Sequence, residues 1–265
     1  MKQVKSVIFD WAGTLIDFGC LAPVQVFVEA FRDKNINITI EEARVPMGLA
    51  KRDHIVALLA MDSVKSQWNS LYGEKITEEQ IDQIYVKLEP ALTKIVPDYS
   101  FPNPYVVETL NSLRNQGIKL GSTTGYVKSM MQAIVPLAEK NKIFLDAVVD
   151  SSDCEEGRPF PYMIQKNMEI FQLHDPTEIV KVGDTIADVR EGLNAGVWTI
   201  GITSSGNEVG LSLEEYGKLS VEEKEHINNK AKRNLLDAGA HFVITEMSEL
   251  TSILDEINIQ LLSLN

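Results

Sequence analysis

The chain has 265 residues, of which 44% are hydrophobic and 24% are charged, a composition typical of a globular protein with one sizeable core or a core and a smaller companion domain. Its formal net charge of −13 at pH 7 argues against nucleic acid or an anionic membrane as a partner, because no basic excess is available to neutralise phosphates. It does not exclude an anionic small substrate, since a metal ion and a few cations reverse the charge inside one cleft.

A short apolar run near the N-terminus predicts the first strand of a sheet. The run 7–9 is followed at once by Asp10 and by a turn that contains glycine. Asp10 is therefore expected at the carboxyl end of a strand, where the ligands of α/β sheets bind. A carboxylate there is costly to bury unless it binds a metal or takes part in chemistry. Two residues further on stands Ala12, where a second carboxylate would be expected.

The next segment, residues 20–97, shows the spacing of amphipathic helices and contains no convincing strand. A helix is expected over about 48–60, and a capping box that begins at Thr77 starts a further one. A single strand is not stable beside a helical bundle, so the first strand belongs with the sheet that follows later in the chain. We therefore predict that residues 20–97 form a helical cap, inserted after the first strand into an α/β core made of residues 1–19 and 98–265.

Strands and helices alternate through the remainder of the chain. Strands are expected at 118–124, 147–149, 179–182, 198–202 and 241–244, with helices over 161–171, through Val189 and Leu193, and at the end of the chain. Such alternation implies a parallel sheet with helices on both faces. The predicted fold class is α/β, a doubly wound, Rossmann-like parallel-sheet core with an inserted α-helical cap domain. The polar segment 204–232 carries a capping box at Ser220 and is expected to be a solvent-exposed decoration.

Polar residues at the ends of three strands favour a site for a metal and a phosphate. After Asp10, the hydroxyls and glycine turn of residues 122–126 offer hydrogen-bond donors for phosphate oxygens. Asp184 and Asp188 lie four residues apart at a strand-to-helix turn, and Arg158 adds a fixed cation before another helix. Carboxylates suit Mg²⁺, whereas hydroxyls and a guanidinium suit a phosphoryl group, so the pattern predicts that both bind at this edge.

This set of motifs, in this order, closely resembles the haloacid dehalogenase superfamily, and the resemblance covers nearly the whole chain. It implies that Asp10 is a nucleophile that becomes an aspartyl phosphate. It also implies that Thr124 and Arg158 hold the phosphoryl group and that Asp184 binds Mg²⁺. The helical insertion would correspond to the superfamily's α-helical cap, which closes over the site.

Ala12 departs from the pattern of the superfamily's phosphatases and mutases. These enzymes carry an acid at this position, which protonates the leaving alkoxide and later activates water. Alanine offers Mg²⁺ its backbone carbonyl but moves no proton. The protein is then either inactive, or its leaving group needs something other than a proton.

Lys51 is the residue that would meet this need. Met47, Lys51 and His54 are expected on one face of the predicted helix, with the lysine in the first turn, where the helix dipole disfavours an ammonium ion. The neighbouring Arg52 and His54, and desolvation by Met47, would lower its pKa in the same direction. A neutral amine forms a Schiff base with a carbonyl, and the iminium lets a carbon leaving group depart from phosphorus as an enamine. An enzyme without an acid at Ala12 requires such chemistry.

Four short motifs resemble the phosphonatase branch of the superfamily, the phosphonoacetaldehyde hydrolases. They are D-x-A-G-T at 10–14, M-G-x-x-K at 47–51, T-T-G-Y at 123–126 and G-R-P at 157–159. The resemblance implies that Lys51 condenses with the aldehyde and that Asp10 takes the phosphoryl group. The enamine is then protonated and hydrolysed to acetaldehyde, and water cleaves the aspartyl phosphate.

The same resemblance implies roles for the residues around these two. By this resemblance, the substrate-binding residues of the chain would be Cys20, Met47, Gly48, His54, Thr124, Gly125, Tyr126 and Arg158. Mg²⁺ would be bound by Asp10, Asp184 and the carbonyl of Ala12, with Thr14 and Asp188 in support. Enzymes of this branch act as homodimers through their caps, so a homodimer is expected.

Two other interpretations stay open. One is a phosphomonoesterase or phosphomutase of the same superfamily, which the missing acid disfavours. The other is a catalytically inactive module that binds phosphorylated ligands. Most helix lysines are simply solvated, so the case for Lys51 depends on its pairing with Ala12 and Met47.

A cytoplasmic location is expected from the cysteines and the apolar runs. Cys20 and Cys154 form no disulfide framework, which suits a reducing compartment. The N-terminus runs straight into the first strand, which leaves no room for a signal peptide. No apolar run approaches the ~20 residues that span a bilayer.

Overall fold

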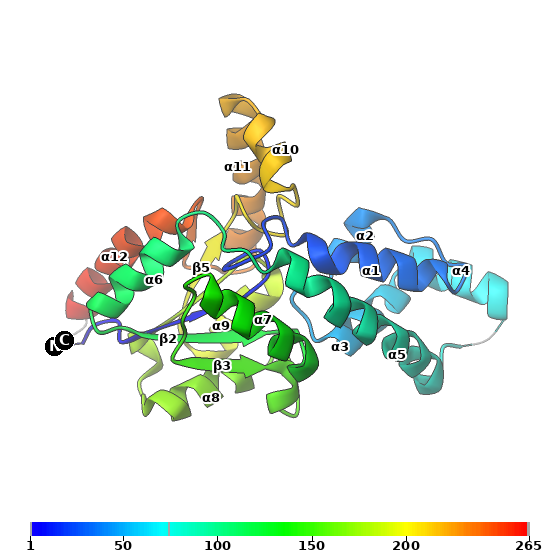
Figure 1. Ribbon diagram of the computed structural model, residues 1–265, viewed down its shortest axis with the longest axis horizontal. Helices are drawn as coiled ribbons and strands as arrows, with labels where there is room; N and C mark the ends of the chain where they lie inside the picture. The colour runs from blue at the N-terminus through cyan, green and yellow to red at the C-terminus, as the bar shows by residue number, and fades with distance from the viewer. Residues whose placement is uncertain (1, 74, 264–265) are drawn as a thin grey trace.

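A six-stranded parallel sheet forms the centre of the computed structural model, which describes residues 2–73 and 75–263 (Figure 1). The strands are β1 (Ser6–Phe9), β2 (Lys119–Thr124), β3 (Ala147–Asp150), β4 (Ile179–Gly183), β5 (Trp198–Ile202) and β6 (Phe242–Ile244). Their order is β3-β2-β1-β4-β5-β6, so the first strand pairs with β2 on one side and with β4 on the other. This confirms the predicted α/β class and the place of the first strand in the later sheet.

Helices cover both faces of the sheet, as expected for a doubly wound fold. One face carries α8 (Tyr162–Phe171), α9 (Ile186–Ala195) and α11 (Val221–Asp237), and the other carries α6 (Val106–Asn115) and α12 (Leu250–Ser263). The side chains of β1 alternate between these two layers: Val7 and Phe9 join the large core, whereas Ile8 packs with Ile164 of α8. Helix α7 (Lys128–Lys140), which was not among the predicted helices, connects β2 to β3.

Of the α-helices that the structure describes between β1 and β2, the first five form a bundle to one side of the sheet (Figure 1). These cap helices are α1 (Leu21–Arg32), α2 (Ile40–Arg44), α3 (Lys51–Ala60), α4 (Asp62–Tyr72) and α5 (Glu78–Ile95). The long helix α5 packs against α1 and α3. The predicted capping box is present: Thr77 accepts from the backbone of Gln80, whose side chain returns a bond to the Thr77 N–H. The 3-10 helix η1 (Val96–Tyr99) then leads the chain back toward the sheet.

The two connections between the cap helices and the sheet run side by side. Ile16 and Pro102 form an antiparallel bridge, and the backbone N–H of Asn103 donates to the carbonyl of Leu15 at 2.9 Å. The Asn103 side-chain amide donates to the carbonyls of Thr14 and Ile16, at 3.1 and 3.0 Å. The chain therefore leaves the sheet and returns to it at one place, directly after β1.

Two predictions are wrong: where the helix after Gly48 begins, and how exposed the segment 204–232 is. Helix α3 begins at Lys51 rather than near Gly48, whose φ of +90° is incompatible with a right-handed helix, so Met47 precedes the helix and does not lie on its face. The segment 204–232 is not exposed throughout. Its first residues are buried, because the backbone N–H groups of Thr203 and Ser204 donate to the chain at the end of β6. The later part, with α10 (Leu213–Lys218) and the beginning of α11, does project from the sheet in Figure 1, whereas the end of α11 packs against β5 and β6.

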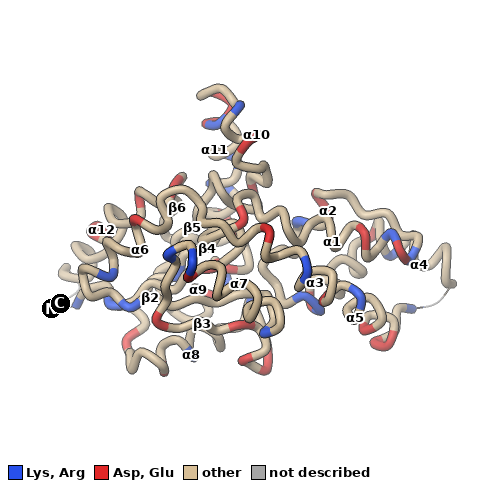
Figure 2. Tube along the Cα trace, viewed as in Figure 1, with Lys and Arg blue, Asp and Glu red and all other residues tan. Residues whose placement is uncertain are grey.

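Charged side chains of both signs are spread over the molecule. Figure 2 shows lysine and arginine interspersed with aspartate and glutamate on the cap helices and on α10 and α11. Among the residues that the structure describes, no helix combines the length and the apolar character that crossing a membrane requires.

Candidate active site

A small cavity lies between the cap helices and the carboxyl edge of the sheet. Its volume is about 20 Å³, little more than one water molecule occupies. It is lined by Asp10, Ala12, Cys20, Pro23, Met47, Gly48, Lys51, Thr124, Gly125, Tyr126, Arg158 and Thr185. The structure thus brings together most of the predicted site residues, and four of them, Thr14, His54, Asp184 and Asp188, do not line the cavity. Because the cavity is so small, a larger ligand enters only if its walls move apart.

Three buried carboxylates meet beside this cavity. Asp10, Asp184 and Asp188 each offer an oxygen, and these oxygens lie within 4.8 Å of one another. Burial and the charge of Asp188 raise the pKa of Asp10, and burial together with Asp10 and Asp188 raises the pKa of Asp184 well above its usual value. Buried like charges at this separation favour a bound cation, and an all-oxygen donor set suits Mg²⁺. The residues present therefore fit the predicted metal.

Asp184 is oriented by two donors from other parts of the chain. The Thr14 hydroxyl donates to its Oδ1 at 3.1 Å, and the backbone N–H of Asn207 donates to its Oδ2 at 2.8 Å. Gly13 leaves the space that the carboxylate occupies, since a Cβ there would lie 2.2 Å from Oδ2. Asn207 was missed from the sequence. Its only signal was its place in a polar loop after β5, at the same edge of the sheet as Asp10.

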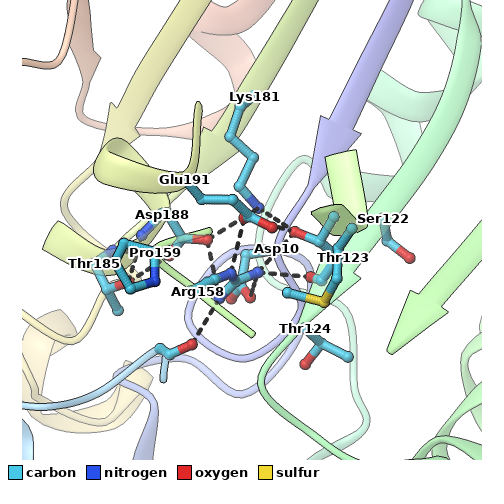
Figure 3. Close-up of polar contacts among 12 residues, drawn as sticks. Asp10, Ser122, Thr123, Thr124, Arg158, Pro159, Lys181, Thr185, Asp188 and Glu191 are labelled. Carbon is cyan, nitrogen blue, oxygen red and sulfur yellow. Dashed lines mark hydrogen bonds and ion pairs between the residues drawn. The ribbon is translucent and has the colours of Figure 1, made fainter. Parts of the chain in front are cut away.

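Arg158 forms the centre of a buried ion-pair network (Figure 3). Its Nη2 lies 2.8 Å from Oδ1 of Asp10, its Nη1 lies 3.0 Å from Oδ1 of Asp188, and its Nε lies 2.9 Å from Oε2 of Glu191. The guanidinium therefore holds the carboxylate of the predicted nucleophile in place. Its contact with a phosphoryl group stays a prediction.

A second buried cation, Lys181 on β4, belongs to the same network (Figure 3). Its Nζ lies 2.9 Å from Oδ1 of Asp188 and 3.4 Å from Oε2 of Glu191, and it donates to the Thr123 hydroxyl at 2.8 Å. Burial raises the pKa of Asp188, but Arg158 and Lys181 outweigh burial and hold that pKa below its ordinary value. Lys181 and Glu191 were missed from the sequence, where the one available signal was a lysine inside an apolar strand.

Lys51 is the first residue of α3 and is 3% exposed. Its Nζ lies 4.8 Å from the ring centroid of Tyr126, and within the described residues no ion pair or hydrogen bond to this nitrogen is recorded. Burial lowers the pKa of Lys51 to about 8, although Cys20 and Asp10 act in the opposite direction. The positive charge that lowers the pKa of Lys51 is that of Arg158 and not, as expected, that of Arg52. Arg52 points away from the cavity and pairs with carboxylates on the exposed side of the helix.

His54 lies behind the cavity. Its ring stacks on Phe27 with the centroids 3.7 Å apart, and its Nε2 lies 2.9 Å from the carbonyl oxygen of Ala43. Burial lowers the pKa of His54 well below its usual value, so the imidazole is neutral. Cys20 and Tyr126 do line the cavity, and burial raises the pKa of both groups well above the usual values, so they face it as a neutral thiol and a neutral phenol.

The cap approaches the edge of the sheet closely through the loop before α3. A Cβ on Gly125 would lie 2.4 Å from the carbonyl oxygen of Leu49, and a Cβ on Gly48 would lie 2.4 Å from the Thr185 hydroxyl. Arg158 also donates to the carbonyl of Gly48 at 3.3 Å. Glycine at both positions therefore lets the cap close against the edge of the sheet.

A protein family and several named proteins resemble this chain, and the named proteins match it over nearly its whole length. A family model for haloacid dehalogenase-like hydrolases matches residues 4–196. A phosphonoacetaldehyde hydrolase from Parabacteroides distasonis is 44% identical over 259 residues, covering 97% of this chain and 98% of that protein. A bifunctional phosphonoacetaldehyde hydrolase/aminoethylphosphonate transaminase from Clostridioides difficile is 43% identical over 256 residues. That match covers 97% of this chain but 40% of the longer bifunctional protein.

Solved structures agree with this relationship. The crystal structure of a phosphonoacetaldehyde hydrolase-like protein from Oleispira antarctica superimposes with a TM-score of 0.95 at 38% identity, covering 97% of this chain and 94% of that one. A hydrolase from Pseudomonas syringae, 22% identical, matches with a TM-score of 0.69 over 96% of this chain and 99% of that one, and shows the shared fold alone. Together with the geometry of the site, these matches confirm the predicted resemblance: the chain belongs to the haloacid dehalogenase-like hydrolases and, within them, to the phosphonoacetaldehyde hydrolase family.

Proposed function

We propose that this enzyme cleaves the C–P bond of phosphonoacetaldehyde to give acetaldehyde and phosphate. The observation that carries the proposal is the buried amine of Lys51, which lines the same cavity as Asp10 and Ala12. Among the residues that the structure describes, this amine forms no ion pair. Relatives that are 40–44% identical over nearly the full chain and are named phosphonoacetaldehyde hydrolase support the substrate.

In the proposed first step, Lys51 forms an imine with the aldehyde. With a pKa of about 8, a useful fraction of the amine is neutral near pH 7.5 and attacks the carbonyl carbon, and water leaves. The cavity wall contributed by Cys20, Met47 and Tyr126 surrounds the two carbons. The protonated imine then stands next to the carbon that is bonded to phosphorus.

In the second step, a carboxylate oxygen of Asp10 attacks phosphorus. The electron pair of the C–P bond moves into the iminium, so the leaving group departs as a neutral enamine and needs no acid at Ala12. Arg158 fixes the attacking carboxylate, and Thr124 is proposed to hold the phosphoryl group. Mg²⁺ held by Asp10, Asp184 and the carbonyl of Ala12 would neutralise charge on the phosphoryl oxygens.

In the last steps, both covalent intermediates are hydrolysed. The enamine takes a proton at carbon to become an iminium, and water releases acetaldehyde and restores the amine of Lys51. A second water cleaves the aspartyl phosphate, which releases phosphate and restores Asp10. The chain is thereby returned to its starting state.

Reductive trapping tests this proposal. Borohydride added together with phosphonoacetaldehyde should reduce the imine to a stable amine, and mass spectrometry should locate the added mass on Lys51. The exposed lysines of the same chain are internal controls, and Lys51→Arg should abolish both the adduct and turnover. An unmodified Lys51, or turnover of sugar phosphates that survives Lys51→Arg, would instead favour a phosphomonoesterase or mutase.

We also propose that the chain acts in the cytoplasm as a homodimer whose subunits meet through their caps, residues 20–97. Support comes from large apolar side chains exposed on this part of the chain, among them Val45, Val56, Leu71 and Val86. Sedimentation velocity of the full chain should show a dimer, and a charged substitution such as Val86→Lys should weaken it. A monomer at all concentrations would contradict this proposal.

A further inference from the structure

Arg44, at the end of α2 in the cap, reaches across to the sheet side of the molecule. Its Nη1 donates to Oδ1 of Asn207 at 3.1 Å and to the carbonyl of Gly19 at 2.9 Å. Its Nη2 donates to the carbonyl of Gly210 at 3.0 Å. The contact is reciprocal, because the Asn207 side-chain amide donates to the backbone carbonyl of Arg44 at 3.2 Å.

Asn207 also contacts the metal-site carboxylate. The backbone N–H of this one residue donates to Oδ2 of Asp184 at 2.8 Å, while its side chain bonds with Arg44. Asn207 is 5% exposed, and its loop is closely packed, since a Cβ on the neighbouring Gly206 would lie 2.7 Å from Cβ of Asp184. The Ser205 hydroxyl donates to the carbonyl of Gly13 at 2.7 Å, which fixes the same loop to the turn after Asp10.

We propose that Arg44 and Asn207 are positioning residues that couple closure of the cap to the orientation of Asp184. When the cap is closed, the Arg44 guanidinium holds the Asn207 side chain, and the Asn207 backbone holds one oxygen of the carboxylate. When the cap opens, Arg44 withdraws, and the loop at 203–210 loses its bonds from the cap. The proposal rests on the proposed function, because it assumes that the reaction takes place in the closed cavity at Asp10 and Asp184.

The coupling is reciprocal by thermodynamic necessity. If closure favours the orientation of Asp184 in which it binds a cation, then a cation bound there favours closure by the same factor. A variant that loses the contact should therefore populate the closed state less. Its apparent affinity for substrate falls with that population, while turnover at saturating substrate falls less, because bound substrate restores closure.

Arg44→Met tests this coupling, and Arg52→Met is the matched control. Both variants remove a guanidinium from the cap, but among the described residues Arg52 pairs with Glu78 and Asp82, both of α5, and with no group of the sheet. For Arg44→Met we expect a KM about tenfold higher or more, as for one charge-assisted hydrogen bond, and a kcat that changes much less. Arg52→Met should keep the KM of the parent chain. Equal KM values for the two variants, or a loss confined to kcat, would overturn the proposal.

Hydrogen exchange supplies a measurement that needs no turnover. With Mg²⁺ and inorganic phosphate added to the full chain, the peptide that contains 203–210 should exchange faster in Arg44→Met than in Arg52→Met. Asn207→Ala should have a smaller effect, because Arg44 also donates to the carbonyls of Gly19 and Gly210. The double variant should fall short of the sum of the two single effects, since both substitutions remove the contact between Arg44 and Asn207. Unchanged exchange in this peptide, or additive effects, would refute the coupling. Failure of the proposed function would instead show as an absence of the Lys51 adduct with the exchange pattern intact.

Discussion

Lys181→Met is expected to destabilise the protein strongly. Methionine has a similar length and no charge, so the substitution removes the ammonium that lies 2.9 Å from Asp188 and 3.4 Å from Glu191 and leaves the packing largely in place. The Lys181 side chain is 1% exposed, and that of Asp188 is also 1% exposed. Removing one partner from such a buried network costs about 3–5 kcal/mol in the free energy of unfolding.

The size of this loss should depend on pH, with a sign that the structure determines. Burial raises the pKa of Asp188, and Arg158 and Lys181 outweigh burial, so the folded pKa lies below the unfolded value. A depressed carboxylate pKa contributes stability above the unfolded pKa and loses it as the pH falls through the folded pKa. Without Lys181 this contribution shrinks, so the deficit of the variant is complete near pH 7 and decreases only as the pH falls below the unfolded pKa of about 3.9 toward the folded pKa.

Urea denaturation followed by circular dichroism measures both effects. Lys119→Met, at the exposed first position of strand β2, is the matched control and should lie close to the parent chain. Lys181→Met/Glu191→Gln removes a carboxylate together with the ammonium and should recover part of the loss. A deficit below about 1 kcal/mol, the level of an exposed ion pair, or a deficit independent of pH, would refute the network as a source of stability.

Three further outcomes follow from the site. Gly125→Ala should raise KM for phosphonoacetaldehyde with little change in the urea midpoint, because its Cβ would lie 2.4 Å from the Leu49 carbonyl and hinder closure; unchanged kinetics would contradict this. Borohydride trapping at Lys51, followed by mass spectrometry, should rise with pH with a midpoint near 8, where half of the amine is neutral; a midpoint near 10.5 would contradict the lowered pKa. Asp184→Asn should weaken Mg²⁺ binding in calorimetry about tenfold or more, whereas equal affinity would exclude Asp184 as a ligand.

The sheet and most of the cavity were predictable because their signals are local. Apolar runs mark the strands, and the carboxyl ends of parallel strands lie at one edge, so Asp10, Thr124 and Asp184 had to approach one another. Lys51 was predictable only together with Ala12 and Met47, since its position on a helix is the same as that of many solvated lysines. The turn at Gly48 was missed: its φ is positive, and a Cβ there would lie 2.4 Å from the Thr185 hydroxyl, a close approach to a residue far away in the sequence.

The supporting residues were not predictable from the sequence, because they depend on distant contacts. Glu191 pairs with Arg158 and with Lys181 only once β4 and α9 have packed together, and no periodicity in the sequence indicates these contacts. Asn207 lies in a polar stretch that is typical of an exposed loop, yet its backbone contacts Asp184, which lies 23 positions away in sequence. Polar residues in such segments acquire a role through tertiary structure alone.

The central position of β1 also bears on how the chain folds during synthesis. Ser6 pairs with Lys119 on one side and with Ile179 on the other, so the first strand to leave the ribosome waits for both of its partners. The cap helices, whose mutual contacts lie within residues 21–95, are complete well before either partner is made. A nascent chain that stops before β4 therefore carries a central strand with one open edge, which is a site for aggregation.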